Sequence, residues 1–87
     1  MISRTATICN QRGLHARAAA KFVRTADGFD CKVLVTRDDQ SVAGTSILGL
    51  MLLGAGEGTE LTLQAEGNDA EAALTALADL IERGFDE

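Results

Sequence analysis

The stretch GLHARAAAKFVR, Gly13–Arg24, contains the only histidine of the chain and its clearest helical pattern. Counting onward from His15, apolar residues recur at the spacing of one buried helix face: Ala19, Phe22, Val23 and Ala26. A different face carries the basic side chains: Arg17, Lys21 and Arg24. The stretch therefore predicts an amphipathic helix that begins near His15 and ends near Ala26 or Asp27.

The start of this predicted helix suits an anion. The first N–H groups of a helix lack intrahelical partners and carry a partial positive charge, so they favour anions and disfavour a protonated imidazole. Gly13 permits a close backbone approach, and Arg17, which opposes the helix dipole, offers a planar fork to phosphate oxygens. We interpret His15 as a phosphoryl acceptor. The alternatives are an ordinary exposed histidine or a helix cap, and Lys21 is interpreted as a solvated side chain.

Working outward, alternation of apolar and polar residues predicts strands at residues 2–9, 31–37, 41–43 and 61–66. Helical periodicity predicts helices at residues 47–53 and 70–81, the second with a capping box from Asn68 and Glu71. Gly28 and Gly84, each followed by phenylalanine, are expected to end helices in the left-handed conformation. Strands with one apolar and one polar face, interleaved with amphipathic helices, predict an α+β fold. In this fold an antiparallel sheet is covered by helices on one side.

The predicted helix at residues 47–53 is apolar on nearly every side, and Thr45 or Ser46 is placed to cap it. A domain this small cannot bury such a helix completely, so we expect part of it to be exposed as a docking surface. The Gly54–Gly58 segment that follows is interpreted as a flexible connector. It runs from helix into strand and lacks the Lys-Ser/Thr ending of a nucleotide-binding P-loop.

The charge of the chain is unevenly distributed. Residues 1–26 carry five basic groups and no acid, whereas residues 27–87 carry three basic and thirteen acidic groups, which gives a net −5. A small basic site on an acidic body argues against general nucleic-acid binding, as does the absence of Trp and Tyr to stack on bases. The expected partner is an anionic group on another protein.

Several other kinds of site are not indicated. Cys9 and Cys31 do not form a zinc or disulfide pattern and are predicted to be buried thiols. No acidic cluster is suited to hydrolysis or metal binding, so neither a metal nor a cofactor is expected. No apolar run is typical of a signal peptide or membrane span, so a cytoplasmic protein without membrane insertion is expected.

Two motifs carry a family resemblance. Gly13-Leu-His15-Ala-Arg17, followed by Thr45-Ser46-Ile-Leu-Gly-Leu-Met51-Leu-Leu-Gly54, resembles the HPr family, the phosphocarriers of the phosphoenolpyruvate-dependent phosphotransferase system. The resemblance extends over essentially the whole chain. It implies a single HPr-like domain at residues 1–87 with a βαββαβα open-faced sandwich, in which three helices lie on one face of a four-stranded antiparallel sheet.

The resemblance also implies roles for particular residues. His15 would accept a phosphoryl group on Nδ1 from Enzyme I and donate it to an EIIA-type protein, with Ala16 and Arg17 binding the phosphate. Ser46 matches the position that an HPr kinase/phosphorylase modifies in many members. The residues implied in partner docking are Ala20, Arg24, Ile47, Leu48 and Met51. Such a protein is a monomeric phosphoryl-transfer intermediate rather than a free-standing enzyme.

The chain departs from the commoner family pattern at one position of the site. Ala18 stands where many members have proline, which leaves an additional backbone N–H at the helix start. The Ala-rich last helix and the ending Gly84-Phe85-Asp86-Glu87 are more similar to the nitrogen-related NPr branch than to the sugar-transport branch, and the two branches stay open. The alternative function is a regulatory docking module that binds enzymes or transporters and never carries phosphate.

Overall fold

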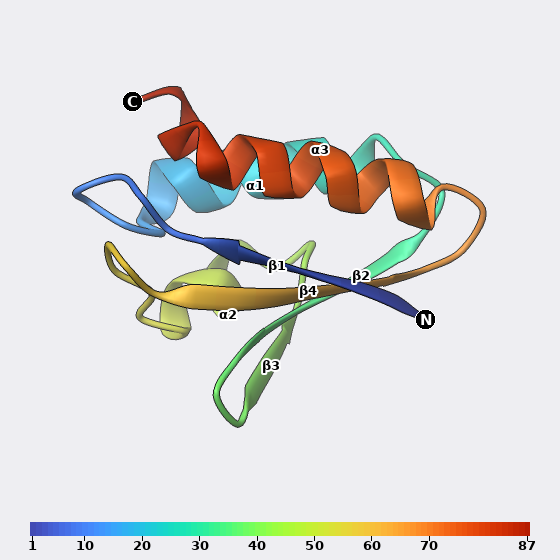
Figure 1. Ribbon diagram of the computed structural model, residues 1–87, viewed down its shortest axis with the longest axis horizontal. Helices are drawn as coiled ribbons and strands as arrows, with labels where there is room; N and C mark the ends of the chain where they lie inside the picture. The colour runs from blue at the N-terminus through green and yellow to red at the C-terminus, as the bar shows by residue number, and fades with distance from the viewer.

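The computed structural model describes all residues from Met1 to Glu87. Its elements follow the predicted order (Figure 1): β1 (Ile2–Thr7), α1 (Ala16–Asp27), β2 (Lys32–Arg37), β3 (Gln40–Ala43), α2 (Ile47–Leu52), β4 (Glu60–Glu66), α3 (Ala70–Glu82) and the short 3₁₀ turn η1 (Gly84–Asp86). The predicted α+β class, with a four-stranded antiparallel sheet and three helices, is confirmed.

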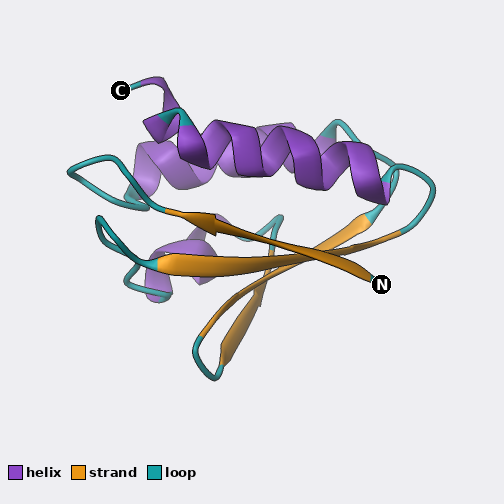
Figure 2. Cartoon of the chain, in the orientation of Figure 1, coloured by secondary structure: helices purple, strands orange, loops and turns teal.

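The sheet has the strand order β1-β4-β2-β3, and every neighbouring pair is antiparallel. Strands β2 and β4 pair centrally, with Val33 opposite Ala65 and Val35 opposite Leu63. These four side chains are buried while their neighbours along each strand are more exposed, so one face of the sheet is apolar. Helices α1 and α3 lie side by side over the sheet, and the edge strand β3 lies farthest from them (Figure 2).

The core is built mainly from Ala, Val, Leu and Ile, and only two aromatic rings are fully buried, Phe22 and Phe85. Ala18 and Ala19 of α1 are also fully buried, and their small side chains allow that helix to pack closely. The short helix α2 contacts α1 and β3 and inserts Leu50 into the same core. The helices α1 and α2 are thereby held next to each other.

Both cysteine predictions were wrong. Cys9 is exposed and its thiol donates to the carbonyl groups of Ile81 and Glu82, because β1 ends at Thr7 and the chain leaves the sheet before residue 9. Cys31 is only half-buried because it precedes β2. Desolvation, with Asp69 and Asp30 nearby, raises the pKa of the Cys31 thiol.

Of three helix-end predictions, one was right in position but not in conformation, one was wrong and one is confirmed. Gly28 ends α1 in a right-handed conformation, with φ −76°. Asp69, rather than Asn68, precedes α3, and its carboxylate accepts from the N–H of Asp30 at 2.7 Å instead of capping the helix. Gly84, in contrast, has φ +68° and ends α3 as predicted.

The glycine-rich segment after α2 packs against the residues that precede α1. The N–H of Leu14 donates to the carbonyl of Ala55 at 2.9 Å. Gly13 has φ +69°, and a Cβ atom there would lie 2.5 Å from that carbonyl oxygen. The positive φ and the short Cβ distance both require glycine at position 13, because a side chain would strain the backbone and collide with the loop.

Substitution Gly13→Ala is therefore expected to lower the free energy of unfolding by about 1–3 kcal/mol. The matched control is Gly56→Ala in the facing loop, where an added Cβ meets no atom within 4 Å and where the change should stay within about 1 kcal/mol of wild type. Urea denaturation followed by circular dichroism measures both. Equal stability of the two variants would contradict the close approach at Gly13.

Candidate functional site

His15 is the N-cap of α1, in agreement with the predicted helix start. Its backbone is extended, with φ −82° and ψ −179°, and its Nδ1 accepts a hydrogen bond from the N–H of Arg17 at 3.3 Å. The side chain is 19% exposed, which leaves it accessible from one side. An Nδ1 atom that accepts a hydrogen bond carries a lone pair rather than a proton, so the proton of the neutral ring is on Nε2.

The second ring nitrogen of His15 faces an acidic side chain that the sequence did not point to. Nε2 pairs with Oε2 of Glu87, while Oε1 of the same carboxylate accepts from Nδ2 of Asn10 at 2.9 Å. Asn10 is buried, and its Nδ2 also donates to the carbonyl of Gly13 at 2.9 Å. The hydrogen bonds from Asn10 and then His15 hold the pKa of the Glu87 carboxyl below its usual range.

Glu87 reaches His15 because the chain turns back after α3 in an unusual conformation. Gly84, Phe85 and Asp86 all have positive φ, at 68°, 58° and 62°. Phe85 is fully buried, and Nζ of Lys21 donates to the Phe85 carbonyl at 2.6 Å. The interpretation of Lys21 as a solvated side chain was therefore wrong, because this lysine ties the turn to α1.

A second set of contacts holds the same turn at the end of α3. Arg83 pairs with Asp79 one turn earlier and with Asp86 in the turn itself. The hydrogen bond between Arg83 and Asp86 lowers the pKa of Asp86 and raises that of Arg83. Since both groups are largely exposed, we treat this pairing as a local constraint on geometry rather than a major source of stability.

The open side of the site is formed by the first turn of α1. Ala16 and Arg17 are exposed, and the Arg17 guanidinium takes part in none of the salt bridges within the protein. Ala18 keeps the N–H that a proline would lack, but the residue is fully buried and this group is shielded from solvent. The N–H of Arg17 donates to Nδ1 of His15, so the helix start offers an anion the N–H of Ala16 and the Arg17 side chain.

The residues considered for partner docking lie on two helices that contact each other. On α2, Ile47, Leu48 and Met51 are exposed, as expected for part of that helix, and Leu52, which was not predicted, is 69% exposed. On α1, Ala20 is half-buried and Arg24 is exposed. We call the four exposed α2 side chains, Ile47, Leu48, Met51 and Leu52, the apolar patch.

Ser46 is the N-cap of α2, where its Oγ accepts from the N–H of Gly49 at 3.0 Å. This contact agrees with one of the two predicted capping positions and replaces a missing intrahelical partner. The hydroxyl therefore has a structural role at the base of the apolar patch. Ser46 is half-buried as a residue.

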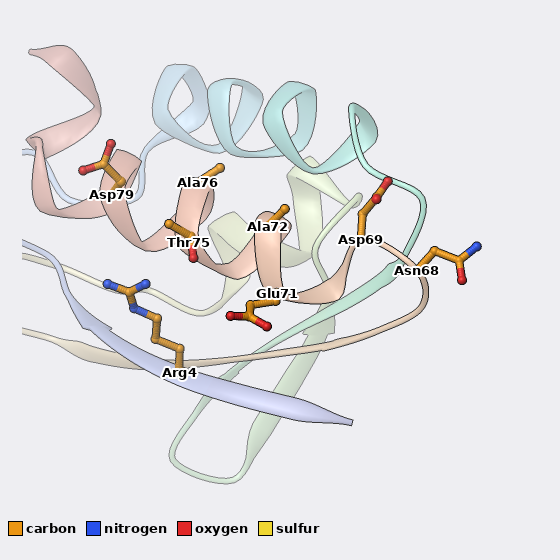
Figure 3. A pocket seen from close by; sticks show the side chains of 8 residues that line it. All are labelled: Arg4, Asn68, Asp69, Glu71, Ala72, Thr75, Ala76 and Asp79. Atoms are coloured by element: carbon orange, nitrogen blue, oxygen red, sulfur yellow. The ribbon is translucent and has the colours of Figure 1, made fainter.

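The largest hollow of the protein lies elsewhere. It is an open depression between β1 and α3 (Figure 3), lined by Arg4, Asn68, Asp69, Glu71, Ala72, Thr75, Ala76 and Asp79. None of the predicted site residues lines it. A smaller depression between α1 and α3 includes Lys21, Arg24 and Arg83. The protein has no cluster of His, Cys, Asp and Glu suited to a metal, and no helix long and apolar enough to cross a membrane.

Sequence reasoning missed Asn10 and Glu87 as parts of the site. Asn10 was interpreted only as turn material, and Glu87 lies 72 residues from His15 in the sequence. Three consecutive left-handed residues are rarely signalled by sequence, because only one of the three is glycine.

Known proteins match the chain over nearly its full length. The sequence model of a family described as "PTS HPr component phosphorylation site" matches residues 2–83. The phosphocarrier protein HPr of Pseudomonas aeruginosa is 52% identical over 82 residues, which cover 93% of this chain and 91% of that protein. The phosphocarrier protein NPr of Shewanella violacea is 42% identical over 86 residues, covering 99% and 94%. A crystal structure of HPr-C-His from Thermoanaerobacter tengcongensis, 47% identical, superposes with a TM-score of 0.94 and covers 100% of this chain and 98% of its own. The chain therefore belongs to the HPr family of phosphocarrier proteins of the phosphotransferase system.

Proposed function

We propose that this protein carries a phosphoryl group on Nδ1 of His15, receiving it from Enzyme I and passing it to an EIIA-type protein. The observation that supports this best is the arrangement of the two ring nitrogens. Nδ1 lies at the positive end of α1 with a lone pair, and Nε2 is held by a carboxylate. Membership of the HPr family supports a phosphoryl group as the anion at this site.

The proposed transfer uses few protein groups. The Nδ1 lone pair of His15 attacks the phosphorus of a phosphohistidine on the donor, and the P–N bond of the donor breaks with its electron pair returning to the donor ring. Formation of the N–P bond consumes the lone pair and so releases the Arg17 N–H from Nδ1. This N–H, the Ala16 N–H and the Arg17 guanidinium then stabilise the phosphoryl oxygens. The reverse sequence delivers the group to a histidine of the acceptor.

The surroundings of His15 suit brief encounters with partners. The apolar patch on α2 lies beside α1, which carries the exposed Arg17 and Arg24. An apolar centre with a basic rim fits a partner whose site is apolar and acidic, and a small interface permits rapid release. The same patch serves donor and acceptor in turn, which requires that they bind one at a time. A monomer is the form that we propose for this exchange.

We also propose that phosphorylation of Ser46 by an HPr kinase/phosphorylase reduces transfer. A phosphate on this N-cap is compatible with the start of α2 because the free N–H groups there favour negative charge. It would place roughly two negative charges next to the apolar patch. Acidic partners would then be repelled without any change in fold.

The central prediction concerns His15. Wild-type protein incubated with phosphoenolpyruvate and Enzyme I should gain the mass of one phosphoryl group in an acid-labile form, and His15→Ala should gain none. Intact-protein mass spectrometry before and after acid treatment measures both. A wild type that stays unmodified, or a variant that is modified equally, would refute the carrier function. Retention of partner binding by His15→Ala alone would then support the docking-module alternative.

A second prediction tests the apolar patch. Leu48→Ser should lower kcat/KM for phosphoryl transfer from Enzyme I by roughly tenfold, the effect of losing about 1.4 kcal/mol of contact energy. Ile2→Ser is the matched control, because Ile2 is also a large apolar side chain, is 43% exposed and lies on β1, outside the apolar patch. Steady-state transfer assays compare the two. Equal losses would show that the patch does not dock the donor.

A third prediction concerns Ser46. Ser46→Asp should weaken transfer because it adds negative charge beside the patch, whereas Ser46→Ala should keep transfer near the wild-type rate and lower stability by about 1 kcal/mol through loss of the cap. Transfer kinetics and urea unfolding separate the two effects. If Ser46→Ala and Ser46→Asp slow transfer equally, the effect comes from the lost cap and not from charge.

A further inference from the structure

Helix α2 carries the apolar patch but is too short to fix its own orientation. It has six residues, of which only Leu50 is buried, whereas isolated helices shorter than about 12–15 residues are marginal in water. Ser46 caps its start, and its last turn contains no basic side chain to compensate the carbonyl groups at its end. The orientation of the patch therefore depends on contacts from other elements of the fold.

The end of α2 is held by an arginine that comes from the sheet. Arg37 is the last residue of β2, and its Nη1 donates to the carbonyl oxygens of Leu53 and Gly54, each at 2.8 Å. Leu53 is the C-cap of α2, and Gly54 follows it with φ +64°. Carbonyl groups at a helix end lack intrahelical partners and carry partial negative charge, so a cation that donates to them stabilises the end. No other side chain donates to either carbonyl group.

The anchor of this contact is firm, and the guanidinium has no strong competing partner. Strand β2 pairs with β4 on one side and with β3 on the other, so Arg37 extends from an inner strand of the sheet. Its Nε lies 4.0 Å from Oδ2 of Asp38, whose side chain is 89% exposed, and an exposed pair at that distance contributes little. Arg37 therefore connects the sheet to the helix that carries the patch.

We propose that Arg37 is a positioning residue for partner docking: by holding the two carbonyl groups that follow α2, it fixes the apolar patch in the orientation that partners bind. Met51 and Leu52 are the last two residues of α2, so a loosened helix end displaces both side chains. No hydrogen bond joins Arg37 to His15, so the residue acts on the encounter and not on the transfer step. This inference rests on the proposed phosphocarrier function and adds a residue to its docking step.

The test is Arg37→Met, which keeps much of the length of the side chain and removes its charge and its donors. The matched control is Arg4→Met, because Arg4 is an exposed arginine on β1 that forms no salt bridge and lines a depression to which α2 contributes no residue. Steady-state transfer from Enzyme I gives KM and kcat, and amide hydrogen exchange gives the local stability of α2 and α3.

We expect Arg37→Met to raise KM about fivefold and to leave kcat within about twofold of wild type, because binding is weakened and the chemistry is not. Exchange of the amides at the end of α2 should become about fivefold faster, while exchange in α3 stays at the wild-type rate. Arg4→Met should leave KM, kcat and the exchange rates of α2 unchanged.

Three results would overturn the inference while leaving the phosphocarrier function intact. If exchange in α2 keeps the wild-type rate, Arg37 does not hold the helix, and any rise in KM reports a direct contact with the partner. If exchange in α3 becomes faster by the same factor, the loss of stability is global. If KM is unchanged, or rises equally in Arg4→Met, the contact with α2 has no part in docking. Failure of wild type to accept phosphate would instead refute the proposed function, and the exchange measurement would still decide whether Arg37 fixes α2.

Discussion

The cap that His15 places on α1 is the contact on which the site depends. One hydrogen bond, from the Arg17 N–H to Nδ1, fixes the ring at the positive end of the helix and orients its lone pair. Gly13 allows the chain to enter this cap because it can adopt positive φ and pack directly on the Ala55 carbonyl. The start of α1 and the orientation of the His15 ring therefore depend on the same requirement, that the first turn of the helix lies within hydrogen-bonding distance of the imidazole.

The remaining constraint on the ring comes from the far end of the chain. A turn of three left-handed residues is held by a buried phenylalanine and by Lys21, and it places Glu87 against Nε2. The largest depression on the surface, between β1 and α3, has no connection with this arrangement. The proposed transfer between proteins needs a shallow site, because the histidine of the partner must approach it, so the position of the largest depression is a poor guide to the proposed function.

The distribution of charge and the exposed apolar surface are the two other features of the proposed docking region. The chain is acidic overall, but its first 26 residues contain no acid, so α1 carries three basic side chains and a single acidic one, Asp27, at its last position. The apolar patch adds contact area beside it, since a six-residue helix that buries only Leu50 cannot hide its other side chains. The two features together support the proposed brief binding of partners, with apolar contact for affinity and charge for orientation.

Periodicity in the sequence determined the order of the elements, the start of α1 and the exposure of α2, because these depend on local spacing and on how much surface a small domain can bury. The places of His15 and Ser46 at helix starts could likewise be predicted from the local sequence, because each residue caps the helix that follows it. Only the tertiary structure decided the Asn10–Glu87–His15 contacts, the bonding of Lys21 and the exposure of Cys9. These depend on where the end of α3 meets the start of α1, and contacts between segments more than sixty residues apart leave no periodic signal in the chain.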